Sequence, residues 1–419
     1  MRKLNFSMLQ EKLACINSMP EFRSELIVLG LGGTVDYEIK WDNSVFQGLI
    51  DSFQIRLSEI ATSEVITTER ELVCNILAYL KNSAGGERQL DNSEIVKIFS
   101  NRFEKKITLG GTGVRAAICM RKFGITSTLH LVSIDDYVRK LLPRDCPYIC
   151  SSDVDTLDPH LIVQFSEKTS LYVEGIHISP SRADRIIITC DPPNEILELS
   201  AKLTETLKKA KIFLISGFNS IHNESLLKLR LNEIEEYSES LPEGSYVFFE
   251  DAGYHRPEFR PIVMERMARL STFFSINEEE LQGYLQRDVD FQDEASIVSA
   301  VHDISKRISV PILMIHTKYW SIVVGSNHVR YVDSLLSGIT MATTRYIFGD
   351  DFTVEDFVST GQLSKNQRSL EMADSINNQL ANFGHFIPAF NAVCESPTTI
   401  GLGDSFVGGF ILGLINDFI

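Results

Sequence analysis

Short apolar runs alternate with amphipathic segments along most of the chain. The runs have the length of buried strands, and glycine, proline or acidic residues follow them. They predict strands at residues 25–30, 107–113, 127–132, 212–216, 246–250, 272–276, 311–316 and 321–324. A 3.6-residue apolar period predicts helices at residues 69–80, 95–103, 115–123 and 333–348, and a last helix that begins near residue 404. This alternation of strands and helices is typical of an α/β domain with a mostly parallel sheet.

Four segments depart from this pattern. Residues 1–20 predict a mixed helical lead-in, and residues 48–103 predict helices. Residues 150–190 carry short strand-like runs between Ser, Asp and Pro, which indicates a small antiparallel β unit. Residues 349–390 form a polar stretch for which no element is predicted.

Length and composition restrict the class of protein. A chain of 419 residues has room for one large domain and a second, smaller unit. The net charge of −16 disfavours a nucleic acid or an anionic membrane as partner, so an anionic ligand needs a local positive site. The seven cysteines show no zinc or redox spacing, and no secretory leader is evident, so reduced thiols and a cytoplasmic location are expected. No apolar run has the roughly 20 residues that cross a bilayer.

The run Thr399-Ile-Gly-Leu-Gly-Asp-Ser-Phe406 carries candidate chemistry for phosphoryl transfer. Gly401 and Gly403 allow the backbone to approach a phosphate closely, and the helix that follows would point its first N–H groups at the anion. Asp404 would then lie at the helix start, where a carboxylate can act as a base toward a hydroxyl group. The alternative is a turn followed by a helix cap, and the segment alone does not decide between the two.

Carboxylates also follow predicted strands upstream. Glu250 ends one strand, and Asn277-Glu-Glu-Glu280 follows the next one along the chain. The carboxyl ends of parallel strands lie at one edge of a sheet, so these side chains could converge there and hold magnesium through water. Acidic loops are also often merely solvated, and this alternative stays open.

The order of these motifs resembles the ADP-dependent glucokinase and phosphofructokinase family, within the ribokinase-like superfamily. The resemblance extends over nearly the whole chain. The matching stretches are GLGGTVD at 30–36, GGER at 85–88, ITLGGTGV at 107–114, SRADRIII at 181–188, ISGF at 215–218, VFFEDAG at 247–253, SINEEE at 275–280, MIHT at 314–317 and TIGLGDS at 399–405.

The resemblance implies roles for the residues of the last motif. Asp404 would be the catalytic base. The backbone of Gly401, Leu402 and Gly403 would form the anion hole over the transferred phosphate.

It also implies a magnesium site that includes Glu250 and Glu280. Asn277 and Glu280 match the family's NxxE pattern, and Asn277 is a candidate for the nucleotide or phosphate site. Phe248 stands where the family has the first residue of its HxE pattern, so only Glu250 is carried over. His316 matches the end of the family's HxHT segment and is interpreted as structural.

Substrate-binding residues follow from two further motifs. Asp36 matches the sugar-binding aspartate, although Thr34 stands where the family usually has Asn. Gly110 and Gly111 match the glycine pair that brings backbone close to the substrate, and Thr112 replaces an amide side chain there.

Three arginines are further candidates. Arg115 stands where the family commonly has an apolar residue, and it could bind a phosphate on the acceptor or be an exposed arginine on a helix. Arg182 and Arg185 fall on the family's paired arginines near the lid. They could reach a nucleotide or substrate phosphate, or form surface ion pairs.

The implied fold is a three-layer α/β/α ribokinase-like domain with a smaller β-containing lid. The large domain would comprise residues 1–36, 104–152 and 185–419, and the lid residues 37–103 and 153–184. The active site would lie between them, and closure of the lid would exclude water from the reaction.

The implied function is magnesium-dependent phosphoryl transfer from ADP to a hydroxyl of a sugar or sugar phosphate, such as glucose or fructose 6-phosphate, with release of AMP. The expected partners are these small molecules, with no nucleic acid and no membrane, and the chain is expected to be a monomer or weak homo-oligomer. One alternative is an ATP-dependent sugar or nucleoside kinase. The other is a non-catalytic homologue that binds a sugar or nucleotide, which is motivated by the departures at Thr34, Thr112, Arg115, Phe248 and Met314.

Overall fold

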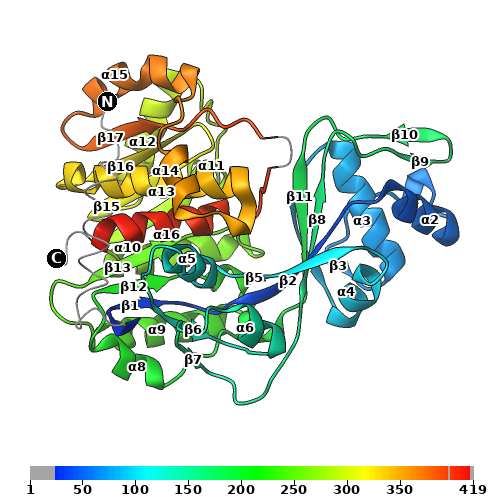
Figure 1. Ribbon diagram of the computed structural model, residues 1–419, viewed down its shortest axis with the longest axis horizontal. Coiled ribbons are helices and arrows are strands. Elements are labelled where there is room, and N and C mark those ends of the chain that lie inside the picture. The colour runs from blue at the N-terminus through cyan, green and yellow to red at the C-terminus, as the bar shows by residue number, and fades with distance from the viewer. Residues whose placement is uncertain (1–23, 395–396, 416–419) are drawn as a thin grey trace.

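The computed structural model describes residues 24–394 and 397–415 as a larger and a smaller lobe (Figure 1). The helical lead-in predicted for residues 1–20 lies outside the described residues. The helices of the described chain include none that is both long and apolar enough to span a membrane.

A nine-stranded sheet forms the centre of the larger lobe. Its strands are parallel from β7 to β15, and the last two strands are antiparallel. In spatial order they are β7 (Tyr148–Cys150), β6 (Thr128–Leu131), β1 (Ile27–Leu29), β12 (Ile212–Ile215), β13 (Tyr246–Glu250), β14 (Phe273–Asn277), β15 (Ile312–His316), β16 (Trp320–Gly325) and β17 (Gly384–Pro388).

Helices cover both faces of this sheet because its strands are apolar on both faces. Phe248 and Phe273 pack into one buried cluster, and the neighbouring Phe249 and Phe274 pack into a second cluster on the other face. The first face is covered by α5 (Thr112–Arg121), α13 (Val332–Phe348), α14 (Val354–Thr360) and α16 (Leu402–Leu414). The second is covered by α8 (Lys202–Leu207), α9 (Glu224–Ser238), α10 (Arg260–Leu270), α11 (Glu278–Leu285), α12 (Glu294–Arg307) and α15 (Gln367–Leu380). The predicted three-layer α/β/α architecture is therefore confirmed.

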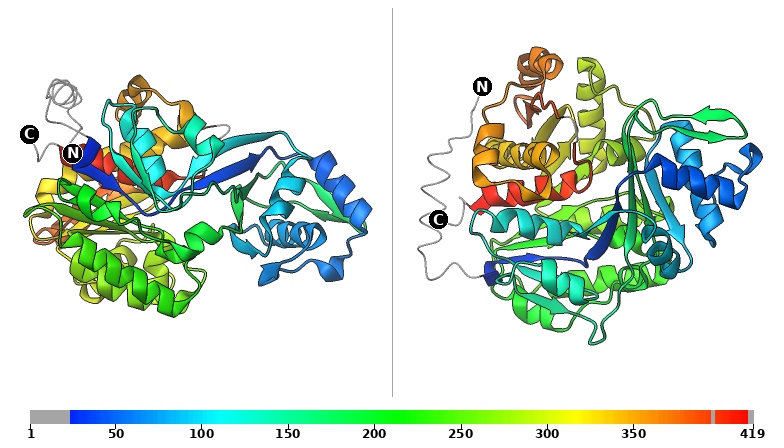
Figure 2. Two further views of the ribbon diagram at one scale, coloured as in Figure 1. Left: turned by 90° about the horizontal axis from the view of Figure 1, so that it is seen from below. Right: turned by 45° about the vertical axis from the view of Figure 1, so that its right-hand side comes forward.

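A mixed six-stranded sheet forms the smaller lobe, which stands to one side of the larger lobe in each view (Figure 2). Its spatial order is β3 (Val65–Ile66), β4 (Gly86–Leu90), β11 (Asp184–Thr189), β8 (His160–Phe165), β2 (Thr34–Ile39) and β5 (Lys105–Gly110). The lobe also holds α2 (Asn43–Phe53), α3 (Glu69–Asn82), α4 (Ser93–Ser100) and a projecting hairpin of β9 (Leu171–Val173) and β10 (Ile176–Ile178). Two short helices, α6 (Asp136–Leu141) and α7 (Pro192–Ile196), lie in connections after β6 and β11.

The two faces of the six-stranded sheet differ in polarity because side chains alternate along each strand. One face is apolar and buried, with Tyr37, Leu161 and Ile186 in the core. The other face is polar: strand register places Asp36 opposite both Thr108 and His160. We call this second surface the polar face. The short connections from β1 to β2 and from β5 to α5 join it to the larger lobe.

The structure corrects two expectations about the smaller lobe. Residues 48–103 contain strands β3 and β4 as well as helices. The small antiparallel unit predicted for residues 150–190 is not separate, because β8 pairs in parallel with β2 and β11 pairs in parallel with β4. Strand β4 was missed because it is only partly buried and carries the polar residues Glu87, Arg88 and Gln89 in place of an apolar run.

The polar stretch at 349–390 contains α14, α15 and β17. In α15 the buried Met372, Ile376 and Leu380 repeat every four residues, with polar residues between them. The apolar stripe is narrow, because α15 packs at the edge of the second helix layer, and the prediction missed it.

The predicted domain boundaries remain a prediction, but the strands bear on their detail. Two boundaries, at 36/37 and 184/185, fall inside β2 and β11. Residues 105–110, which were assigned to the large domain, form β5 of the six-stranded sheet.

Candidate active site

The Gly-Leu-Gly-Asp segment opens α16, as predicted. Gly401 is the N-cap and adopts a left-handed conformation with φ 66°, which favours glycine. Ser405 secures the turn, since its Oγ donates to the Gly401 carbonyl at 2.8 Å. Asp404 lies in the first helical turn and remains partly exposed. The first N–H groups of a helix lack intrahelical partners, so this start can bind an anion.

Arg115 forms ion pairs with both Asp36 and Asp404. Its Nη2 donates to Asp36 Oδ2 at 2.7 Å, and its Nε lies 3.6 Å from Asp404 Oδ2. Glu38 Oε1 is 4.0 Å from the same Nη2. Arg115 is only 3% exposed, so the alternative of an exposed helical arginine is wrong.

Two of the predicted glycines leave space for this network. A Cβ at Gly110 would lie 2.6 Å from Asp36 Oδ2, and a Cβ at Gly401 would lie 2.6 Å from Arg115 Cδ. At Gly111, where φ is 90°, it would lie 2.8 Å from Gly33 Cα. These positions therefore require glycine for packing within the protein itself. Thr112 follows directly as the first residue of α5.

Asp36 has further partners on the polar face. Thr34 Oγ1 donates to Asp36 Oδ1 at 2.8 Å, so the hydroxyl at this departure from the family pattern still supplies a donor. His160 Nδ1 lies 3.9 Å from the same oxygen, and His160 Nε2 lies 3.1 Å from Asp191 Oδ2. Burial lowers the pKa of His160, but the hydrogen bond and charge of Asp191 outweigh it and raise the pKa to about 9.

Sequence reasoning missed His160 and Asp191. The available signal was the strand-like run at 161–165, one of those noted within residues 150–190, which His160 directly precedes. Only the pairing of β8 with β2 shows that this histidine lies beside Asp36.

The strand-end carboxylates gather on the other side of α16. Glu250 is 6% exposed, and its Oε1 lies 3.0 Å from His316 Nε2. A Cβ at Gly403 would be 3.8 Å from the same Oε1, so the anion-binding loop and Glu250 are neighbours. The ring of His316 stacks on Phe406 with centroids 4.4 Å apart.

Asp251 and Glu280 extend this acidic group. Burial, followed by the charge of Asp251, raises the pKa of Glu280, and burial likewise raises the pKa of Asp251. Asp251 Oδ2 accepts from Tyr284 Oη at 2.5 Å. Glu280 forms a capping box with Asn277, accepting from its backbone N at 2.7 Å and its Nδ2 at 2.8 Å. Asn277 is thereby assigned a structural contact, and its role toward a nucleotide remains a prediction.

The donor set fits a divalent cation held partly through water. Glu250 Oε2 and Asp251 Oδ1 are buried without a hydrogen-bond partner among the described residues. In that part of the chain, no group of three His, Cys, Asp or Glu side chains is arranged to hold a metal directly. Water would therefore have to supply other ligands, as Mg²⁺ commonly requires.

The two predicted lid arginines lie differently. Arg182 is 65% exposed in its side chain, and its Nε donates to the Ser83 carbonyl. Arg185 pairs in register with Gln164, whose Oε1 accepts from Thr399 Oγ1 at 3.1 Å. Arg185 therefore lies on a strand position beside the loop that leads into Gly401, whereas Arg182 lies at the end of α3.

Other contacts also connect the polar face to the larger lobe. Glu87 Oε1 lies 3.2 Å from His255 Nε2, in the loop after β13. Lys106 Nζ lies 2.7 Å from Asp350 Oδ2. The polar face is thus tied to the carboxyl edge of the larger sheet.

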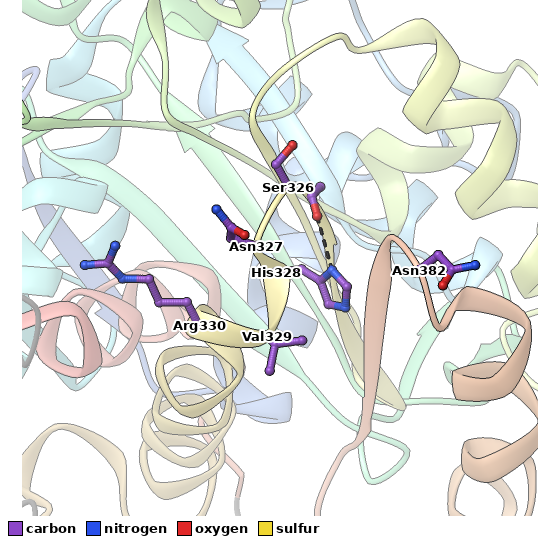
Figure 3. Close-up of a pocket in the computed structure, with 7 residues that line it drawn as sticks. Ser326, Asn327, His328, Val329, Arg330 and Asn382 are labelled. Carbon is purple, nitrogen blue, oxygen red and sulfur yellow. Dashed lines mark hydrogen bonds between the residues drawn. The ribbon is translucent and has the colours of Figure 1, made fainter.

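Two cavities lie at opposite ends of the larger sheet. A cavity of about 530 Å³ opens where β16 ends (Figure 3). It is lined by Gly325, Ser326, Asn327, His328, Val329, Arg330 and Asn382. A cavity of about 10 Å³, enough for one water molecule, lies beside Thr34 and Asp191. Only the second adjoins the candidate site.

Comparison with known proteins adds independent evidence. A family model described as the ADP-specific phosphofructokinase/glucokinase conserved region matches residues 25–411. No curated protein matches the sequence.

Solved structures share the fold at low sequence identity. A hypothetical ADP-dependent phosphofructokinase from Pyrococcus horikoshii OT3 is 18% identical, with a TM-score of 0.76, over 96% of this chain and 99% of that one. An ADP-dependent kinase in complex with fructose-6-phosphate and ADPβS is 12% identical, with a TM-score of 0.72, over 99% of both chains. These structures share the three-layer fold, and the extent of the family match shows that the chain belongs to the ADP-specific phosphofructokinase/glucokinase family.

Proposed function

We propose that this protein transfers a phosphoryl group from ADP to a hydroxyl of a sugar or sugar phosphate and releases AMP. Family membership supports the donor and the general class of acceptor. The observation that carries the chemistry is the position of Asp404, in the first turn of α16 and 3.6 Å from a buried arginine. The candidate base Asp404 therefore lies within the first turn of the helix whose N-terminus would bind the phosphate.

Asp404 would accept the proton of the attacking hydroxyl. The backbone N–H groups of Leu402 and Gly403 would hold the phosphate oxygens as the donor bond breaks, and the helix dipole would favour the negative charge. Proton removal by a positioned base commonly contributes about 10²- to 10⁴-fold in rate. Asp36 would accept hydrogen bonds from acceptor hydroxyls and orient them toward Asp404.

Glu250 is the side chain best placed to hold magnesium through water, because one of its buried oxygens is unpartnered among the described residues. Asp251 offers a second such oxygen. The predicted ligand Glu280 would act more indirectly, since both of its oxygens bind Asn277. Bound magnesium would neutralise charge on the nucleotide phosphates.

Arg185 is the better candidate of the two lid arginines for a phosphate contact. It lies on the strand whose neighbour, Gln164, binds Thr399. The identity of the acceptor depends on whether a phosphorylated sugar can bind there. The solved structure of another ADP-dependent kinase, in complex with fructose-6-phosphate, suggests one acceptor to test. Glucose is the other.

An acceptor screen with magnesium and either ADP or ATP tests the proposal. We expect AMP to form only when ADP and a suitable acceptor are both present, in equal amount to the phosphorylated product. ATP-driven turnover without ADP-driven turnover would reject the proposed donor, and nucleotide binding without turnover would indicate a non-catalytic homologue.

A further inference from the structure

Arg115 lies in the centre of the candidate site, but its contacts differ from those of a ligand-binding arginine. It projects from α5 and is 3% exposed. Its guanidinium contacts carboxylates from two separate elements, Asp36 on β2 and Asp404 on α16. It also packs beneath Gly401, where a Cβ would lie 2.8 Å from Nη1.

We infer that Arg115 is a positioning residue that holds the acceptor-orienting Asp36 and the base Asp404 in one ion-pair network. The inference rests on the proposed function. It assigns Arg115 to the alignment of acceptor and base, and not to a phosphate on the acceptor, because its guanidinium is already shared between carboxylates.

Geometry explains why an arginine is required. The planar guanidinium presents several N–H donors in fixed directions, so Nη2 can serve Asp36 while Nε faces Asp404. A lysine ammonium is a single compact charge and cannot occupy both positions. An apolar side chain would leave two carboxylates close to one another without a cation, and they would repel.

The network also connects the two lobes. Asp36 belongs to the six-stranded sheet, whereas Asp404 and Arg115 belong to helices that cover the nine-stranded sheet. Fixing the polar face relative to α16 would fix the distance between the acceptor hydroxyl and its base. Misplacement of about 1 Å can cost about 10²-fold in rate.

The test uses the full chain with Arg115→Met and Arg115→Lys. Arg230→Met is the matched control, since Arg230 is also buried but lies on α9, where it binds the Ile196 carbonyl and Glu233. Calorimetric titration with ADP gives the number of folded binding sites, and turnover is expressed per site.

For Arg115→Met we expect kcat to fall by about 10²-fold and the acceptor KM to rise about 10-fold, with ADP affinity within about twofold of wild type. Arg115→Lys should retain more acceptor affinity than Met but still lose at least about fivefold in kcat, because one ammonium cannot serve both carboxylates. Arg230→Met should keep wild-type kcat and KM per site.

A purely structural role would lower the number of folded sites but leave kcat per site and acceptor KM unchanged, and this result would overturn the inference. If Arg115→Met does not fold, Arg115→Lys decides: wild-type kcat per site in that variant overturns the inference. An inactive wild-type protein would overturn the proposed function and this inference with it. An active wild-type protein with unaffected Arg115 variants would overturn this inference alone.

Discussion

The two sides of the α16 start differ in their balance of charge. On the acceptor side, Arg115 faces Asp36 and Asp404, and His160 faces Asp191. On the acidic side, Glu250, Asp251 and Glu280 are all buried. Its hydrogen-bond partners in the described chain include His316, Tyr284 and Asn277. Tyr254 also bonds to Asp251.

The difference indicates where the protein supplies the positive charge itself and where a bound cation would supply it. The acceptor side has cations from its own sequence, so its carboxylates are paired without a ligand. In the part of the chain that the structure describes, no arginine or lysine forms a direct ion pair with the acidic side. Burial raises the pKa of both Asp251 and Glu280, although the charge of Arg260 lowers both in part. A bound divalent cation would supply the missing positive charge.

The largest effect that separates the two sides is expected for Glu250→Gln. The change removes a charge from the acidic side, so the magnesium concentration for half-maximal turnover should rise by at least about 10-fold. Acceptor KM should stay near the wild-type value. Turnover measured against magnesium, at saturating ADP and acceptor, checks both quantities.

Glu279→Gln is the control because Glu279 lies exposed on α11, beside Glu280 but outside the buried acidic group. Its magnesium dependence should equal that of the wild type. An unchanged magnesium requirement in Glu250→Gln would remove the distinction between the two sides.

A smaller effect is expected for His160→Gln on the acceptor side. The pKa of His160 is raised to about 9, so protonated His160 stabilises the fold fully below its ordinary pKa of about 6.5. That stabilisation is lost as the pH rises through 9. We expect the variant to lose about 1–3 kcal/mol of unfolding free energy at pH 6, and progressively less toward pH 9.5.

Urea unfolding at both pH values measures this loss. His177→Gln is the control, because His177 is exposed on the β10 strand of the hairpin. An equal loss at pH 6 and pH 9.5 would show that His160 does not contribute through its charge.

The smallest effect is expected for Lys106→Gln. Lys106 also lies on the polar face, but its ion pair with Asp350 is half exposed on the lysine side. Exposed pairs contribute about 0–1 kcal/mol, so stability should change by less than about 1 kcal/mol and turnover should not change. Thermal unfolding and a turnover assay check this. A larger loss would mean that surface pairs, and not only the buried network, hold the acceptor side together.

Elements with a clear apolar period were predictable from the sequence. The strands that end at Glu250 and Asn277 and the helix that begins at Leu402 follow the predicted ranges closely. The carboxyl ends of parallel strands lie at one edge of a sheet, so the sequence could predict that Glu250 lies close to the glycine loop at 401–403.

The acceptor-side network could not be predicted in the same way. Arg115 and Asp36 are separated by 79 positions, and their contact depends on how β2 and α5 are placed relative to each other. Sequence reasoning therefore left Arg115 between exposed and phosphate-binding alternatives. His160 was missed because strand register, and not local composition, places it beside Asp36.

Turnover of Asp404→Asn, measured together with ADP affinity, tests the central claim most directly. The variant removes the proposed base but keeps the shape of the α16 start. We predict AMP formation at least about 10²-fold slower than in the wild type, with ADP affinity retained. Wild-type turnover in Asp404→Asn would contradict the assignment of this residue as the base.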